Sequence, residues 1–104
     1  DIYRDWGWAP EYVKAMYLML RQKYPKDLVI GSGEKNSLRN FVYEVFRLLE
    51  IPKNRLKTKT KTLMRKRDIK AYRADPRLAK KILKWKAKTT FKKIIYKMVN
   101  EQLY

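Results

Sequence analysis

Most of the side chains in this sequence that could do chemistry are cations. The 104 residues include 27 Lys or Arg against 10 Asp or Glu, and they include no Cys and no His. Thiolate and imidazole chemistry is therefore excluded, and so is a zinc site of the ordinary type. Basic side chains without such neighbours suit phosphate binding better than catalysis. We expect no enzyme activity, no metal and no cofactor.

The positive charge is concentrated in the second half of the chain. Residues 1–52 carry eight Lys or Arg and seven Asp or Glu, whereas residues 53–104 carry 19 and three, so the net charges are +1 and +16. Repulsion among so many like charges destabilises a compact fold unless a partner of opposite charge offsets it. The basic surface of a thermophile protein would carry matching Glu, which this half lacks. We therefore expect a polyanionic partner.

The basic half contains a run at 57–62 in which Lys and Thr alternate. Strict alternation places the three lysines on one face of an extended segment, which could lie along a row of phosphates. Tyr72 and Trp85 lie among the cations and are candidates for stacking on unpaired bases. The predicted phosphate contacts are Lys57, Lys59, Lys61, Arg65, Lys66, Arg67, Arg73, Arg77, Lys80, Lys81, Lys84, Lys86 and Lys88.

Apolar residues at helical spacing predict the elements that position these cations. A first helix has Pro10 in its first turn and ends near 23–24, because Pro25 disfavours helical geometry in the residue before it. Its apolar face consists of Ala9, Val13, Met16, Tyr17 and Leu20. A second helix is capped by Ser37 and stopped by Pro52. Its apolar face consists of Leu38, Phe41, Val42, Val45, Phe46 and Leu49.

Two further helices are predicted in the basic half. The third starts at Asp75 and Pro76, and its inward residues are Leu78, Ala79, Ile82 and Leu83. The last is capped by Thr89 or Thr90, and its apolar side consists of Phe91, Ile94, Ile95, Met98 and Leu103. A short strand is expected at 27–30. The prediction is one domain, 1–104, of mostly helical α+β class, with about four helices and one or two short strands.

The sequence predicts a soluble, cytoplasmic protein. No stretch approaches the roughly 18 to 20 apolar residues that span a bilayer, and the first eight residues do not follow the charged-then-apolar pattern of a signal peptide. Attachment to an anionic membrane would need a basic helix with a free apolar face, whereas the apolar faces predicted here are needed for the core. We expect no membrane partner.

Short motifs occur in a recognisable order along nearly the whole chain. They include Arg4-Asp5-Trp6-Gly7, Tyr12-Val13, Met19-Leu20, Val29-Ile30-Gly31-Ser32-Gly33 and Ser37-Leu38-Arg39-Asn40-Phe41-Val42, followed by Arg65, Asp68-Ile69, Asp75-Pro76, Ala79-Lys80, Leu83, Trp85-Lys86 and Met98-Val99. In this order they resemble the C-terminal third of the GDP-mannose 4,6-dehydratases, which are extended short-chain dehydratases. The resemblance implies a fold like the small C-terminal domain of these enzymes, which helps to hold the nucleotide sugar.

The resemblance does not reach the family's catalytic part. Its Rossmann domain binds NADP and carries the catalytic Thr or Ser, Glu, Tyr and Lys. A G-x-G-x-x-G fingerprint is absent here, because Asn36 stands where a third glycine would follow Gly31 and Gly33. None of the Tyr residues is followed by Lys at the fourth place. Hydride chemistry therefore has no site in this chain, and we expect no nucleotide cofactor.

The retained part also departs from the family pattern. The resemblance matches Arg65 to the family's phosphate-binding Arg and Asp68 to a nearby acid, but Lys66 replaces the Pro that follows that Arg. Ala74 replaces a Gly, and Lys84 stands at the Gly of the family's Leu-Gly-Trp-Lys-Pro motif. We interpret these changes as an old nucleotide-sugar fold put to a new use, with Trp6 and Trp85 keeping the fold.

The charge leads us to expect a non-catalytic RNA-binding protein, specifically a ribosomal or ribosome-associated one. Its partners would be rRNA and neighbouring ribosomal proteins. Because no RNA-recognition or zinc-finger signature is present, recognition would be of shape and backbone. Two alternatives remain. One is a protein that coats duplex DNA, and the other is the substrate-binding domain of a split or truncated GDP-mannose 4,6-dehydratase-like enzyme.

Overall fold

The computed structural model of the chain describes residues 2–58 and 70–101. Within these residues the elements are β1 (Tyr3–Arg4), α1 (Ala9–Leu20), β2 (Asn36–Ser37), α2 (Leu38–Leu48), the 3₁₀ turn η1 (Lys53–Arg55), α4 (Arg77–Leu83) and α5 (Phe91–Glu101). Four helices and a two-stranded antiparallel sheet confirm the predicted mostly helical α+β class. No helix of the described part is both long enough and apolar enough to cross a membrane.

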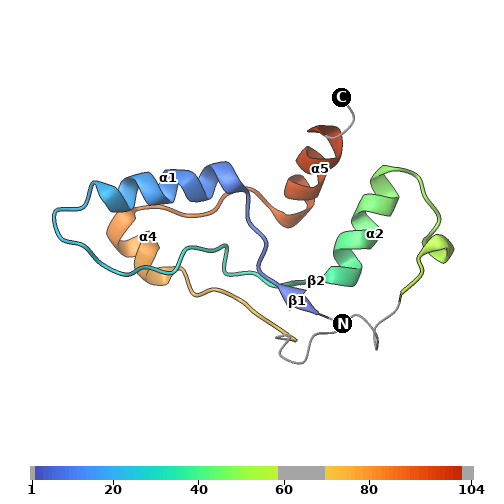
Figure 1. The fold of residues 1–104 in the computed structure, drawn as a ribbon, viewed down its shortest axis with the longest axis horizontal. Helices are drawn as coiled ribbons and strands as arrows, with labels where there is room; N and C mark the ends of the chain where they lie inside the picture. Colours follow the sequence, from blue (N-terminus) through green and yellow to red (C-terminus); the bar gives the residue numbers. More distant parts are fainter. Residues whose placement is uncertain (1, 59–69, 102–104) are drawn as a thin grey trace.

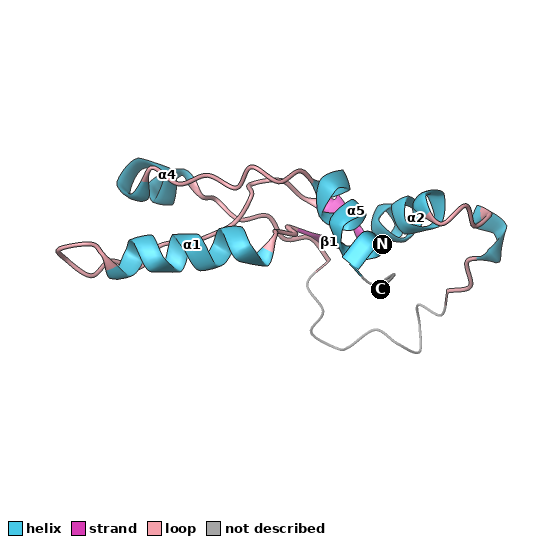
Figure 2. Cartoon of the chain, turned by 90° about the horizontal axis from the view of Figure 1, so that it is seen from above, coloured by secondary structure: helices cyan, strands magenta, loops and turns pink. Residues whose placement is uncertain are grey.

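The helices pack in two pairs. Helix α1 lies against α4, and α2 lies against α5, with the small sheet between the two pairs (Figure 1). The view from above separates the same two pairs (Figure 2). Each pair takes one helix from the near-neutral half of the sequence and one from the basic half. The two halves are therefore interleaved in space, although their charges differ so strongly.

The N-terminal segment joins the two pairs by lying between two other segments. On one side β1 pairs with β2, with Tyr3 opposite Ser37 and Arg4 opposite Asn36. On the other side the Tyr3 N–H donates to the carbonyl of Lys70 at 2.8 Å, and the Tyr72 N–H donates to the carbonyl of Tyr3 at 3.1 Å. The start of the chain thus fixes the position of the segment that leads into α4.

Each helix pair has its own apolar cluster. Between α1 and α4 the buried side chains are Ala15, Ala79, Leu83 and Trp85. Between α2 and α5 the ring of Trp6 lies 5.2 Å from that of Phe41 and 5.7 Å from that of Phe91, measured between centroids. Ile94 and Ile95 of α5 are buried beside them. Edge-to-face and tilted ring pairs of this kind add stabilisation beyond their buried area.

Several predicted details are wrong. The first helix ends at Leu20, earlier than expected. The run 27–30 is not a strand, because the strands of the described residues are β1 and β2. The side chains of Leu78 and Met98, expected inside, are 42% and 45% exposed. The face of α1 that was expected inside is turned outward, because Leu20 on that face is 85% exposed. The helix instead buries Ala15, which was not predicted to face the core. Leu103 lies outside the described residues.

The predicted caps of α2 and α5 are confirmed. The Ser37 hydroxyl accepts from the Asn40 N–H at 3.0 Å, and the Thr90 hydroxyl accepts from the Lys93 N–H at 3.3 Å. Such caps satisfy N–H groups that the first turn of a helix leaves unpaired. Helix α4 differs from the prediction, because Pro76 occupies the N-cap position and Asp75 precedes it.

Helix α4 ends in a residue that is poorly suited to its backbone. Lys84 has φ 56° and ψ 30°, the left-handed conformation in which a Cβ crowds the following carbonyl. Glycine is the usual residue at such helix ends, and the family pattern noted above has Gly at this place. The Lys at 84 therefore costs stability to the fold.

We predict that Lys84→Gly raises the free energy of unfolding by roughly 1 kcal/mol, because the left-handed conformation costs an L residue about that much. Urea denaturation monitored by tryptophan fluorescence would measure the change. Lys86→Gly removes the same charge two residues further on and should not stabilise the protein. Equal stabilisation by both variants would instead point to relief of charge repulsion.

Candidate anion-binding site

One carboxylate, that of Asp5, fixes the framework of the candidate site. It accepts hydrogen bonds from the Ser32 N–H at 3.1 Å, the Ser32 hydroxyl at 2.5 Å, the Gly33 N–H at 2.8 Å and the Ala74 N–H at 3.1 Å. We call this group of four residues the Asp5 junction. It joins the end of β1, the loop before β2 and the segment before α4, so it positions the basic residues on either side of Ala74.

Small residues allow the three segments to approach so closely. A Cβ on Gly31 would overlap with the Cβ of Ala74, and Gly33 has φ +84°, which L residues rarely adopt. A Cβ on Gly33 would also lie 3.3 Å from the ring of Pro76. The sequence Gly31-Ser32-Gly33 is therefore a structural loop that meets Ala74, and it is not a dinucleotide fingerprint.

Two arginines flank an acid beside Ala74 of the Asp5 junction. The guanidinium of Arg77 donates to both oxygens of Asp75, at 2.9 and 2.7 Å, and the Arg77 N–H donates to the same carboxylate at 3.3 Å. These bonds, with the nearby positive charge of Arg73, lower the pKa of Asp75 to about 2. Asp75 is thus ionised at neutral pH, and Arg73, Asp75 and Arg77 together carry one net positive charge.

Helix α4 continues this positive surface. Arg77, Lys80, Lys81 and Lys84 occur at the three-to-four spacing that places side chains on one helix face. All four are exposed, while Ala79 and Leu83 face the core. We call these four residues the α4 cation stripe. Together with Arg73 it is the largest group of predicted phosphate contacts that the described structure brings onto neighbouring elements.

The other predicted contacts are placed differently. Lys57 is exposed and follows η1, which lies at the opposite end of the molecule from α4 (Figures 1 and 2). Lys86 and Lys88 are exposed in the segment between α4 and α5. The remaining predicted contacts lie outside the described residues: Lys59, Lys61, Arg65, Lys66 and Arg67. The described cations therefore do not form a single basic face.

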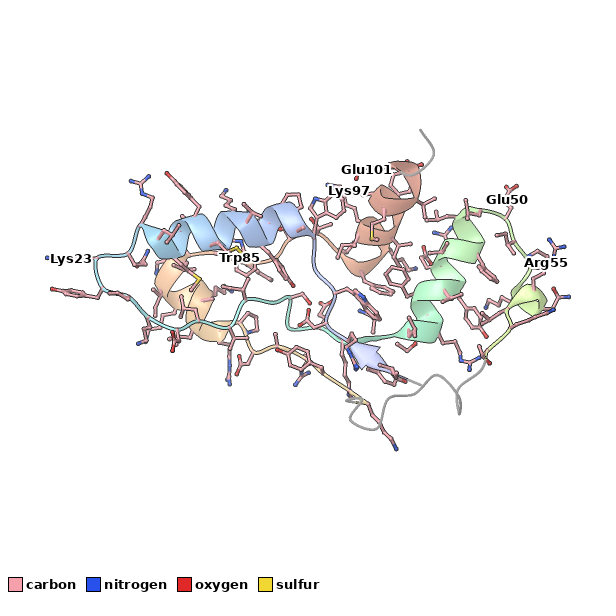
Figure 3. The ribbon with its side chains drawn as sticks, viewed as in Figure 1. Lys23, Glu50, Arg55, Trp85, Lys97 and Glu101 are labelled. Atoms are coloured by element: carbon pink, nitrogen blue, oxygen red, sulfur yellow. The ribbon has the colours of Figure 1, made fainter. Side chains whose placement is uncertain are left out.

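The two stacking candidates have different surroundings. Tyr72 is 49% exposed, whereas Trp85 is only 5% exposed. The indole N–H of Trp85 donates to the Glu11 carbonyl at 3.0 Å, and its ring meets that of Tyr12 edge-on. Figure 3 shows Trp85 beside α1 in the interior of this helix pair. The stacking role proposed for Trp85 is wrong, and its interpretation as a fold-keeping residue is confirmed.

Sequence reasoning missed Glu11, which holds the segment between α4 and α5 against α1. Its carboxylate accepts from the Lys88 N–H at 2.6 Å and the Thr89 N–H at 2.9 Å. Burial alone would raise the pKa of Glu11, but hydrogen bonds from the Thr89 side chain and these N–H groups lower it below its ordinary value. The only signal in the sequence is an acid in the first turn of a helix whose one other charged residue is Lys14.

Comparison with known proteins now decides the family. The family model described as GDP-mannose 4,6 dehydratase matches residues 1–98. The chain belongs to the GDP-mannose 4,6 dehydratase family. Relatives named GDP-mannose 4,6 dehydratase are 37% identical over 117 residues in Dictyostelium discoideum and 36% identical over 120 residues in Homo sapiens. Each alignment covers 96% of this chain, which spans only about a third of these relatives, 33% and 32% respectively.

Solved structures show the same fold within larger chains. The chain matches RMD from Pseudomonas aeruginosa, solved in complex with NADPH, with a TM-score of 0.79 and 16% identity. It matches the enzyme WbmG of Bordetella bronchiseptica, solved in complex with NAD and UDP, with a TM-score of 0.76 and 21% identity. The matches cover 97% and 96% of this chain but only 33% and 31% of the other two.

The dehydratase family overturns the main functional prediction. A non-catalytic ribosomal or ribosome-associated RNA-binding protein is wrong, and so are rRNA and ribosomal proteins as partners and the ribosome as location, because the relatives are nucleotide-sugar dehydratases. The prediction that the chain is not an enzyme is wrong for the same reason, since it belongs to a family whose members are named as an enzyme, of which it spans only a part. Net charge misled because it attracts any polyanion and identifies none.

The Asp5 junction yields a stability prediction. Asp5→Asn keeps the shape of the side chain but points an N–H₂ group at backbone donors, so it should lower the free energy of unfolding by roughly 2 to 3 kcal/mol. Urea denaturation measures this loss. Asp27→Asn, which alters an exposed acid that accepts no such bond from a described residue, is the matched control. Equal effects of the two variants would contradict the role assigned to Asp5.

Glu11 yields a pH prediction. Because its pKa is lower in the folded protein than in the unfolded chain, the stability it contributes is present above about pH 4.5 and is lost as the pH falls through the folded pKa. Glu11→Gln should therefore destabilise the protein at pH 7, and this difference from wild type should shrink as the pH falls below 4.5. Thr89→Val removes a side-chain hydrogen bond to Glu11, so the effect of Glu11→Gln at pH 7 should be smaller in a Thr89→Val background than in the wild type. A pH-independent effect would show that the carboxylate charge is unimportant.

Proposed function

We propose that this chain is the nucleotide-sugar-binding part of a GDP-mannose 4,6-dehydratase. The observation that carries the proposal is the family match over residues 1–98, together with relatives of that name that are up to 37% identical over nearly the whole chain. The retained region includes the Asp5 junction and the segment that follows it. This was the alternative left open beside RNA binding.

A dinucleotide-binding part has to be supplied by further polypeptide. This chain has neither the G-x-G-x-x-G fingerprint nor a Tyr followed by Lys at the fourth place, and it spans about a third of its relatives. A dinucleotide bound by that other part would supply the hydride chemistry. The residues of this chain would then bind the nucleotide sugar and orient it.

Arg73 and Arg77 are the residues of the described structure that we assign to the diphosphate of the nucleotide sugar. Arginine binds phosphate oxygens in a bidentate manner, and both side chains emerge beside a backbone held by the Asp5 junction. In the free protein the guanidinium of Arg77 donates to the carboxylate of Asp75. The diphosphate would either displace this carboxylate or bind Arg77 together with it. Arg65, matched to the family's phosphate-binding Arg, would be a third contact, although it lies outside the described residues.

The remaining cations of the α4 cation stripe have a simpler proposed role. A diphosphate carries few charges and needs few direct contacts. Exposed lysines nearby raise the local positive potential and so increase the rate at which an anionic ligand arrives, an effect that salt weakens. Lys80, Lys81 and Lys84, with Lys86 and Lys88 beyond them, would act in this way rather than each binding a phosphate.

Titration calorimetry of the 104-residue chain with GDP-mannose tests the proposal. Replacing Arg73 and Arg77 together by Ala should weaken binding by about tenfold or more, because each charged hydrogen bond contributes roughly 1.5 kcal/mol or more. Arg55→Ala with Lys57→Ala removes the same charge at the opposite end of the molecule and should change the affinity less than about twofold.

Two results would contradict the proposal. One is an affinity for GDP-mannose no greater than that for inorganic diphosphate, since the guanosine and the sugar would then contribute nothing. The other is equal weakening by the two double variants, which would reduce the assigned contacts to a general effect of charge. Loss of binding only in the Arg73 and Arg77 variant, with unchanged thermal stability, would support it.

A further inference from the structure

The segment between α4 and α5 presents a row of lysines to solvent. It runs beside α1 (Figure 1), where the carbonyl and the carboxylate of Glu11 accept hydrogen bonds from the Trp85 indole and the Lys88 N–H. Lys84, Lys86 and Lys88 are exposed, whereas the residues between them are buried or half-buried. Such alternation is typical of an extended chain with one face on the core. We call these three lysines, with the backbone that joins them, the lysine ridge.

The lysine ridge carries charge that no described acid pairs with. Residues 76–100 contain nine Lys or Arg and no Asp or Glu. None of the three lysines forms an ion pair with a residue that the structure describes. Like charges close together repel one another, and an anion placed along them removes the repulsion. The ridge therefore favours an anionic partner.

The backbone of the lysine ridge is also unpaired. The N–H groups of Lys86 and Ala87 and the carbonyls of 85–88 form no hydrogen bond with any residue among 2–58 and 70–101. An extended stretch with unpaired N–H and carbonyl groups is a template on which another extended chain can pair. An ionised phosphate only accepts hydrogen bonds, whereas a polypeptide backbone both donates and accepts them. This feature favours a polypeptide among the possible anions.

Two departures from the family's Leu-Gly-Trp-Lys-Pro motif lie within the ridge. Lys84 stands at its Gly and Ala87 at its Pro. Lys84 adds a cation in a left-handed conformation, φ 56°, that favours Gly. Ala87 adds an N–H group that Pro lacks. A residue held in a conformation that costs stability points to a function, and both changes favour pairing with an acidic chain.

We propose that the lysine ridge is a docking site for an acidic polypeptide that lies along it in an extended conformation. Alternate side chains on one face of an extended chain are roughly 7 Å apart. Asp or Glu at every second position of the partner would therefore meet Lys84, Lys86 and Lys88 in register. Backbone hydrogen bonds at Lys86 and Ala87 would fix this register.

The inference goes beyond the proposed function and does not rest on it. GDP-mannose offers neither a row of carboxylates nor a peptide backbone, so it cannot occupy the ridge in this way. A lipid surface is disfavoured as well, because basic segments that bind a bilayer also insert apolar side chains. The apolar side chain between Lys84 and Lys86 is that of Trp85, which is 5% exposed and packs on Tyr12.

Fluorescence anisotropy of labelled peptides with the 104-residue chain tests the docking site. One peptide alternates Glu and Thr along its whole length, and the other has the same composition with every Glu before every Thr. The alternating peptide should bind at least roughly fivefold more tightly, because only it offers carboxylates along one face of an extended chain.

Two changes that restore the family motif separate charge from backbone pairing. Ala87→Pro keeps every charge but removes one N–H donor, so it should weaken binding of the alternating peptide about fivefold. Lys84→Gly removes one charge and should weaken it about threefold, although this change is expected to stabilise the fold. Lys57→Gly removes an equal charge at the opposite end of the molecule and should change the affinity less than about twofold.

Each outcome decides the question. Equal binding of the two peptides, or equal weakening by Lys84→Gly and Lys57→Gly, overturns the docking site, because the contact is then one of net charge alone. Tighter binding of an oligouridylate of equal charge assigns the ridge to a polynucleotide and also overturns it. If Ala87→Pro does not fold, the comparison of Lys84→Gly with Lys57→Gly still gives the answer. Binding of the alternating peptide by a chain that does not bind GDP-mannose supports the docking site and rejects the proposed function.

Discussion

The carboxylate of Asp5 is the contact on which the rest of the structure depends. Its hydrogen bonds reach Ser32 and Gly33 and, 69 residues away in sequence, Ala74. A single charged acceptor that satisfies several backbone donors is a strong constraint, because no other acceptor among residues 2–58 and 70–101 is bonded to those N–H groups. The Asp5 junction sets where the segment after the basic run enters α4, and hence where Arg73 and Arg77 emerge.

Two further contacts make one unit from two small clusters. The ring of Trp6 joins α2 to α5, one residue after Asp5. Glu11 and Trp85 fasten the connection between α4 and α5 to α1. Because each helix pair combines an N-terminal and a C-terminal helix, neither half of the sequence could form a core alone. The near-neutral half thus supplies the frame, and the basic half supplies the exposed cations.

The same arrangement explains why the charge could be misread. The +16 charge of residues 53–104 is conspicuous in the sequence, and phosphate is the natural partner of such a segment. In space, however, Lys57 and the α4 cation stripe lie at opposite ends of the molecule, and Arg77 is engaged by Asp75. A net charge sums these cations and cannot reveal how the fold separates and engages them.

The sequence by itself determined the mostly helical class, the caps at Ser37 and Thr90 and the family to which the ordered motifs point, because these depend on local spacing and on residue types in order. Tertiary structure alone decided which face of α1 is buried, that Asp75 pairs with Arg77, and that Asp5 and Glu11 anchor distant segments. Periodicity fixes that α1 is helical but cannot rank two apolar faces, and a carboxylate carries no sequence signal for backbone donors that only folding brings to it.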